Sequence, residues 1–133
     1  MKTNKLLLAL TLVVLISAPA ASAQEKLGQV HFPVSCSAAA QQEFDRAVAL
    51  LHSFWFDASA KAFAAVTQTD PGCAMGHWGE AMAILFSPNP FVGTPTPKGL
   101  QDACPAVERA KAAGPKTQRE RDYIAAVESL CQE

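Results

Sequence analysis

The sequence carries none of the short motifs that mark the common catalytic sites. It has no Gly-x-Ser-x-Gly nucleophile elbow, no His-Glu-x-x-His zinc motif and no glycine-rich phosphate loop. It also lacks the Cys-x-x-Cys spacing, which excludes a zinc ribbon, a thioredoxin-like redox pair and a haem-attachment site. We therefore expect no enzymatic activity and no cofactor.

An excess of basic charge is absent as well. The 133 residues include 11 basic and 12 acidic side chains, and these are scattered along the chain and not gathered in blocks. Nucleic acids and anionic membranes are bound through basic patches, which this balance does not supply. We expect no nucleic-acid partner.

The one long apolar run lies near the N-terminus, at residues 6–16. Lys2 and Lys5 precede it, and Ala21-Ser22-Ala23 follows it as a small-residue cleavage site. These three features form the pattern of a secretory signal peptide, whereas a membrane span needs about 20 apolar residues. We expect residues 1–23 to be removed and the remaining chain to be periplasmic or secreted in a bacterium, without membrane insertion. A retained N-terminal anchor is the alternative.

Beyond residue 23, the spacing of apolar residues predicts helices. Residues 24–36 lack a helical period, so we expect an extended lead-in whose apolar edge, formed by Val30, Phe32 and Val34, lies along the domain. Five amphipathic helices follow, at about 38–54, 57–69, 72–86, 97–113 and 117–131. Residues 87–97 contain four prolines and form the longest loop.

Residues that favour helix ends stand at these boundaries. The expected N-caps are Ser37, Asp57, Thr96 and Thr117. Thr117 opens a full capping box with Glu120, while Gly114 suits the end of the fourth helix and Pro71 the first position of the third. Pro105 falls inside the fourth helix, where it predicts a kink or two short pieces.

Four cysteines follow the expected cleavage point: Cys36, Cys73, Cys104 and Cys131. An even number in an exported chain favours disulfides, although four cysteines allow three pairings. Cys36 and Cys73 stand near the starts of two successive helix pairs, one repeat length apart, so we prefer this pair. Cys104 and Cys131 fall on consecutive helices and form the possible second bridge. Buried free thiols are the alternative.

Residues 44–71 resemble a tetratricopeptide repeat, which is a pair of helices that stacks in arrays. The positions that match the family's small, aromatic and closing residues are Ala47, Phe56, Ser59, Phe63, Asp70 and Pro71. Leu50 and Val66 depart from the usual pattern. Residues 74–83 resemble the first helix of a second repeat, with Trp78 in the aromatic region and Ala81 as the small residue.

Four longer stretches also resemble the N-terminal part of larger exported bacterial tetratricopeptide-repeat proteins of uncharacterised function. These stretches are VHFPVSC, FDRAVALLHSFWFDASAKAF, DPGCAMGHWGEAM and TQRERDYIAAV. The resemblance implies an all-α, right-handed array of helical hairpins over residues 37–133, with repeat one at 38–71, a divergent repeat two at 72–113 and a final helix at 117–131. It also implies a scaffold for a protein or peptide partner. A truncated member of that family is an alternative.

Two groups of residues are candidates for a ligand site. Cys73, Met75 and His77 are soft ligands that suit copper, but Met75 points away from the helix face that Cys73 and His77 share. We prefer a bridged cysteine, a core methionine and a surface histidine. The alternative is a small metal- or ligand-binding module that uses Cys73, His77 and His52.

The second group is the aromatic run Phe54-Trp55-Phe56, which lies beside His52 between the first two helices. Exposed aromatic side chains anchor ligands in binding grooves. A tight corner between two helices also needs large side chains to fill it. We prefer the second interpretation and predict that these three rings pack in the core of the repeat.

Overall fold

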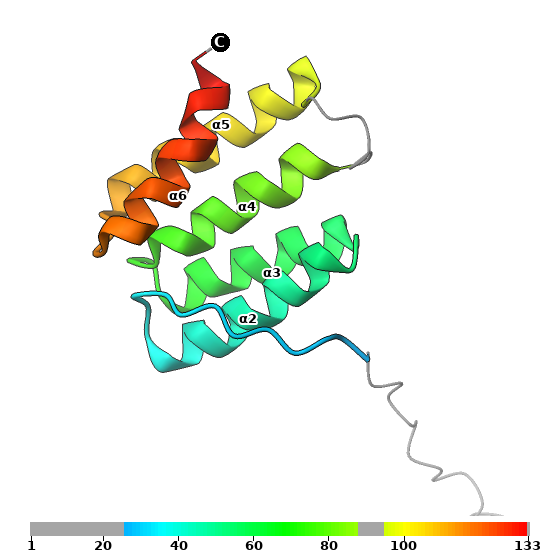
Figure 1. The fold of residues 1–133 in the computed structure, drawn as a ribbon, viewed down its shortest axis with the longest axis vertical. Coiled ribbons are helices and arrows are strands. Elements are labelled where there is room, and N and C mark those ends of the chain that lie inside the picture. The colour runs from blue at the N-terminus through cyan, green and yellow to red at the C-terminus, as the bar shows by residue number, and fades with distance from the viewer. Residues whose placement is uncertain (1–25, 88–94, 133) are drawn as a thin grey trace, which may run out of the picture.

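The computed structural model of this 133-residue chain describes residues 26–87 and 95–132, and this part of the chain is all-α (Figure 1). The helices are α2 (Ala38–His52), α3 (Phe56–Thr69), α4 (Ala74–Phe86), α5 (Pro97–Ala113) and α6 (Gln118–Glu128), followed by the 3₁₀ turn η2 (Ser129–Cys131). The predicted all-α class with five helices is confirmed. The expected signal peptide and residues 88–94 of the proline-rich loop lie outside the described residues.

The helices stack in chain order. α2 packs on α3, α3 on α4 and α4 on α5, and α6 then folds back against α4 and α5 (Figure 1). The apolar face of α6 therefore packs against α4 and α5 of the same chain. No helix in the described ranges is both long and apolar enough to cross a membrane.

Several helix ends follow the local chemistry that the sequence predicts. The Ser37 hydroxyl accepts a hydrogen bond from the Ala40 N–H, and the Thr96 hydroxyl accepts one from the Gly99 N–H. Gly114 ends α5 in the left-handed conformation, with φ at 77°. The capping box at the start of α6 is complete. Each of these contacts joins residues within four positions of one another, so sequence alone locates them.

Two predictions about helix ends are wrong. Trp55, not Asp57, is the N-cap of α3, because the Ser59 N–H already donates to the Trp55 carbonyl at 2.8 Å; Asp57 stands in the first turn. Pro71 lies in a turn closed by the hydrogen bond from Cys73 N–H to the Asp70 carbonyl, and α4 begins at Ala74.

Of the two outcomes predicted for Pro105, a kink or two short pieces, the division into two short pieces does not occur. α5 is one helix from Pro97 to Ala113. The missing Pro105 N–H would have donated to the carbonyl of Gln101, and both residues are exposed, so water can take the place of that bond. Packing of α5 on α4 holds the helix together across this position.

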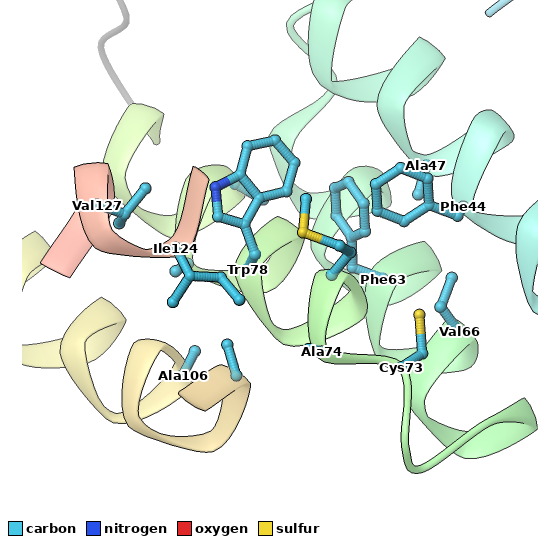
Figure 2. Close-up of a cluster of buried hydrophobic side chains, with 14 of the residues drawn as sticks. Phe44, Ala47, Phe63, Val66, Cys73, Ala74, Trp78, Ala106, Ile124 and Val127 are labelled. Carbon is cyan, nitrogen blue, oxygen red and sulfur yellow. The ribbon is translucent and has the colours of Figure 1, made fainter. Parts of the chain in front are cut away.

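The core lies between α2, α3 and α4 and extends to α5, which contributes Ala106, and to α6, which contributes Ile124 and Val127 (Figure 2). Its largest fully buried side chains include Phe44, Phe63, Leu50 and Met75, and the Phe44 and Phe63 ring centroids are 5.5 Å apart. Five of the residues that resemble the repeat signature are buried: Ala47, Ser59, Phe63, Trp78 and Ala81. Phe56 and Asp70 are half-buried, and Pro71 is exposed. The Ser59 hydroxyl donates to the Ala47 carbonyl at 3.0 Å, which satisfies a buried polar group at the α2–α3 crossing.

Candidate functional site: an aromatic hollow beside a clamped extended segment

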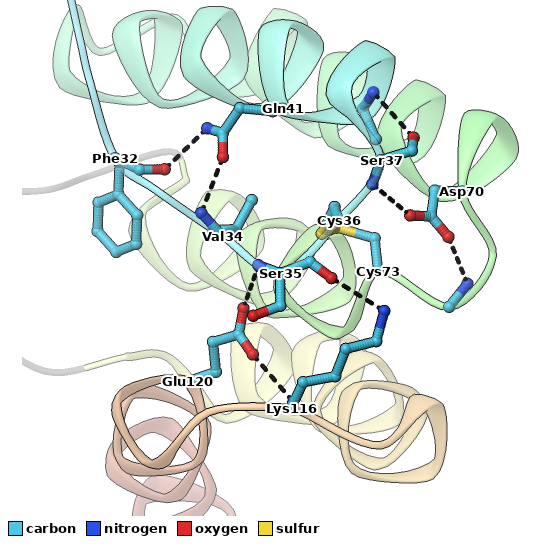
Figure 3. The surroundings of a disulfide bond; sticks show 12 residues. Phe32, Val34, Ser35, Cys36, Ser37, Gln41, Asp70, Cys73, Lys116 and Glu120 are labelled. Carbon is cyan, nitrogen blue, oxygen red and sulfur yellow. Dashed lines mark hydrogen bonds between the residues drawn. A yellow bond between two sulfur atoms is a disulfide. The ribbon is translucent and has the colours of Figure 1, made fainter.

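Two disulfides cross-link the domain. Cys36 is bonded to Cys73, with Cα atoms 5.0 Å apart, and Cys104 is bonded to Cys131, with Cα atoms 5.8 Å apart. These are the two pairs named in the sequence analysis, and the described residues contain no free cysteine. The first bridge ties the extended lead-in to the start of α4, and Asp70 beside it accepts a hydrogen bond from Ser37 N–H at 2.8 Å (Figure 3). Two disulfides are the usual mark of an oxidising compartment.

The lead-in lies along the helices as an extended segment, as predicted. Its burial alternates: Val30, Phe32 and Val34 are half-buried against the core, while His31 and Pro33 are exposed. This alternation is the period of an extended chain with one apolar edge. The segment is therefore held along one side and open to solvent on the other.

Five polar side chains bind the backbone of this segment, and we call them the backbone clamp: Gln41, Asp45, Lys116, Arg119 and Glu120. On the α2 side, the Phe32 N–H donates to the Asp45 carboxylate at 3.0 Å. The Gln41 amide accepts from Val34 N–H at 2.8 Å and donates to the Phe32 carbonyl at 2.9 Å (Figure 3).

The other half of the clamp comes from the start of α6 and the residues just before it. The Ser35 N–H donates to Glu120 Oε1 at 2.6 Å, Lys116 Nζ donates to the Ser35 carbonyl at 3.1 Å, and Arg119 donates to the Pro33 carbonyl at 3.2 Å. Burial alone raises the pKa of Glu120, but hydrogen bonds from the backbone N–H groups of Ser35, Thr117 and Lys116 outweigh it and lower the pKa below its ordinary value. Glu120 is thus held as a carboxylate.

An aromatic socket receives the Phe32 side chain. The centroid of its ring lies 5.5 Å from that of Phe44, 6.0 Å from that of Trp78 and 5.3 Å from that of Tyr123. The Arg119 guanidinium lies 4.4 Å above the Phe32 ring centroid, within the range of a cation–π contact. The side chain that enters the socket thus contacts α2, α4 and α6 together.

A hollow of about 450 Å³ opens beside Phe32, and we call it the aromatic hollow. Its lining residues are Phe32, Val48, Leu51, His52, Phe54, Phe56, Trp78, Met82, Phe86 and Tyr123. Phe54 is 57% exposed, Phe86 42% and Tyr123 37%. No carboxylate is present in this lining. The hollow is therefore an apolar, ring-rich surface open to solvent.

The exposure of Phe54 overturns the prediction that the aromatic run packs in the core. Trp55 is likewise 48% exposed, and of the three residues Phe56 alone packs against the core. The reason lies in the backbone: Phe54 has φ at 60°, a left-handed conformation that bulky residues rarely adopt. His52 lies beside this run and lines the same hollow as Phe54 and Phe56. The sequence shows the apolar run, but it does not show that the backbone at Phe54 has a positive φ.

One buried polar atom in the described ranges has no hydrogen-bond partner, and it belongs to the wall of the hollow. Trp78 is 6% exposed, and its Nε1 is unpaired. An unsatisfied buried donor costs about 1–3 kcal/mol.

The candidate metal ligands are not brought together. Cys73 is fully buried in its disulfide and Met75 is fully buried in the core. The His77 Nδ1 lies 3.5 Å from a Glu80 oxygen that also accepts from Arg109 at 2.9 Å, whereas His52 lines the aromatic hollow. Across residues 26–87 and 95–132, no three histidine, cysteine or acidic side chains are grouped to hold a metal ion. The metal-binding alternative therefore has no support from the geometry.

We compared the chain with known proteins. No protein-family model, no curated protein and no solved structure matches this chain.

Proposed function

We propose that this chain is an exported, tetratricopeptide-like scaffold that binds an apolar segment of a partner protein in the aromatic hollow and catalyses no reaction. The observation that carries the proposal is the gathering of three exposed rings, Phe54, Phe86 and Tyr123, around one hollow. Contiguous apolar surface of this kind usually marks an interaction site. Rigid aromatic side chains are also common anchors of protein interfaces.

The tetratricopeptide assignment is supported by where the matching residues pack. Ala47 and Ser59 meet at the crossing of α2 and α3, and Ala81 is buried on α4. Stacked helical hairpins present one continuous face built from the first helix of each pair, and such faces bind peptides or proteins. Here α2 and α4 occupy those places, and both contribute residues to the hollow.

The charge around the hollow favours a partner segment with neutral or acidic flanks. The lining contains no carboxylate, and the cationic Arg119 lies over the Phe32 and Tyr123 rings at its edge. Complementary charge around an apolar anchor improves specificity and the rate of association. The two disulfides, together with the N-terminal pattern of the sequence, support a periplasmic or secreted location.

Selection from a phage-displayed peptide library against the oxidised chain tests this function. We expect enriched peptides to share a large apolar residue and to bind the double variant Phe54→Ser/Phe86→Ser at least about tenfold more weakly, because both rings are removed from the hollow. Trp55→Ser is the matched control: it removes an equally exposed ring that does not line the hollow. No enrichment, or equal loss in both variants, would contradict the proposal.

A further inference from the structure

We propose that the backbone clamp and the aromatic socket form a binding site for extended peptides with the pattern aromatic–proline–apolar, and that the chain's own residues Phe32, Pro33 and Val34 occupy it. This site is distinct from the aromatic hollow, although Trp78 and Tyr123 of the socket also line the hollow, as Phe32 itself does. It recognises backbone groups in addition to one ring. The partner class it accepts is an extended segment supplied by a second protein.

The first argument is the completeness of the backbone recognition. Residues 32–35 make six hydrogen bonds to the clamp, from the N–H groups of Phe32, Val34 and Ser35 and to the carbonyls of Phe32, Pro33 and Ser35. A surface segment held only by its apolar edge can leave these groups to water at little cost. Here side chains from two remote parts of the chain converge on four consecutive residues, as in a receptor for an extended peptide.

The second argument explains the proline. Pro33 has no N–H, so its place in the clamp requires no acceptor, and its side chain is exposed. Proline also restricts the preceding residue to extended conformations. The clamp binds the segment in such an extended conformation. A proline after the aromatic residue therefore reduces the conformational entropy that a free peptide loses on binding.

The third argument concerns the ability of the segment to exchange. The apolar side chains of the segment are only half-buried, and its contacts to Lys116 and Arg119 are solvent-exposed. The Cys36–Cys73 bridge keeps the segment next to its site, at a high effective concentration. A peptide in solution therefore competes poorly with the intact lead-in and gains access when the lead-in is weakened.

The test uses the full oxidised chain and a fluorescein-labelled peptide of residues 29–35, QVHFPVS. In fluorescence anisotropy titrations, we expect the Phe32→Ala chain to bind this peptide at least about tenfold more tightly than the unmodified chain, because the internal competitor is weakened. The same peptide with Phe32→Ala should bind neither chain. Adding Gln41→Ala to the Phe32→Ala chain should reduce binding at least about fivefold, because two backbone hydrogen bonds are lost.

Circular dichroism and thermal unfolding establish that each variant is folded. If Phe32→Ala does not fold, Phe32→Leu makes the same comparison with an apolar side chain retained. A folded variant that fails to bind the peptide, or that binds the alanine peptide equally well, overturns the proposal. So does the failure of both variants to fold, because the segment is then an integral part of the core. A double variant, Phe32→Ala/Phe54→Ser, separates this site from the hollow, because Phe54 lines the hollow and is not part of the clamp. We expect this double variant to bind the peptide as tightly as the Phe32→Ala chain does.

Discussion

The Glu120 carboxylate joins Ser35 to the start of α6, although the two residues are 85 positions apart. One carboxylate oxygen accepts the Ser35 N–H, and the other accepts the N–H groups of Lys116 and Thr117. Glu120 is only 5% exposed. The Glu120 side chain thus caps the start of α6 and also holds the lead-in at Ser35.

Replacing this carboxylate should destabilise the fold. Glu120→Gln retains the size of the side chain but weakens three hydrogen bonds and places an amide NH₂ near backbone donors, so we expect a loss of about 1–3 kcal/mol. Thermal unfolding of the oxidised chain measures it. Glu108→Gln is the matched control, since Glu108 is 67% exposed and its change should cost little. An equal effect at the two positions would contradict the role assigned to Glu120.

The same residue should make stability depend on acid pH. The pKa of Glu120 is lowered in the folded chain, because its backbone hydrogen bonds outweigh the effect of burial. Its contribution is therefore present above the ordinary carboxyl pKa of about 4.3 and is lost as pH falls through the lower, folded value. Unfolding curves of the unmodified and Glu120→Gln chains between pH 7 and pH 2 should converge in acid. A constant difference would exclude this titration.

Each disulfide should contribute substantially to the stability of this small domain. The bridges close loops of 37 and 27 residues, for which the chain-entropy model gives about 3–4 kcal/mol each. We expect each double cysteine-to-serine variant to unfold well below the oxidised chain. Removing Cys36–Cys73 should also speed amide exchange at Phe32 and Val34, whereas removing Cys104–Cys131 should not. Equal exchange in both variants would argue against a tether for the lead-in.

The contact between Gly79 and Phe63 should tolerate no side chain. A Cβ atom at Gly79 would lie 2.2 Å from the Phe63 ring, which is fully buried. Overpacking should outweigh the better helix propensity of alanine, so Gly79→Ala should cost about 1–3 kcal/mol. Gly28→Ala is the control, because a Cβ there meets nothing within 4 Å. Denaturant titration distinguishes the two, and a neutral Gly79→Ala would show that α3 and α4 can separate.

Phe54 should be retained for binding and not for stability. Its left-handed backbone disfavours a bulky side chain, and asparagine adopts this conformation more readily. Phe54→Asn should therefore leave the unfolding free energy unchanged or raise it by up to about 1 kcal/mol, while it weakens the binding of peptides selected on the hollow. A marked loss of stability would instead make Phe54 a structural residue.

Several helix ends that depend on neighbours within a few residues were predictable from the sequence, although Asp57 and Pro71 were assigned the wrong positions. Ser37, Thr96 and the Thr117–Glu120 capping box locate helix starts, because each cap bonds to a backbone group three positions away. The spacing of one repeat length between Cys36 and Cys73 also anticipated their bond.

The tertiary structure alone decided which rings are buried and where the lead-in is held. Phe54 and Trp55 have the apolar character of core residues, but their exposure follows from the backbone direction at one turn, which composition does not encode. The clamp likewise unites Gln41 with Glu120 only after α6 has folded back against α4 and α5. Local chemistry determined the elements of this protein, and the packing of distant helices created the surfaces proposed to bind its partners.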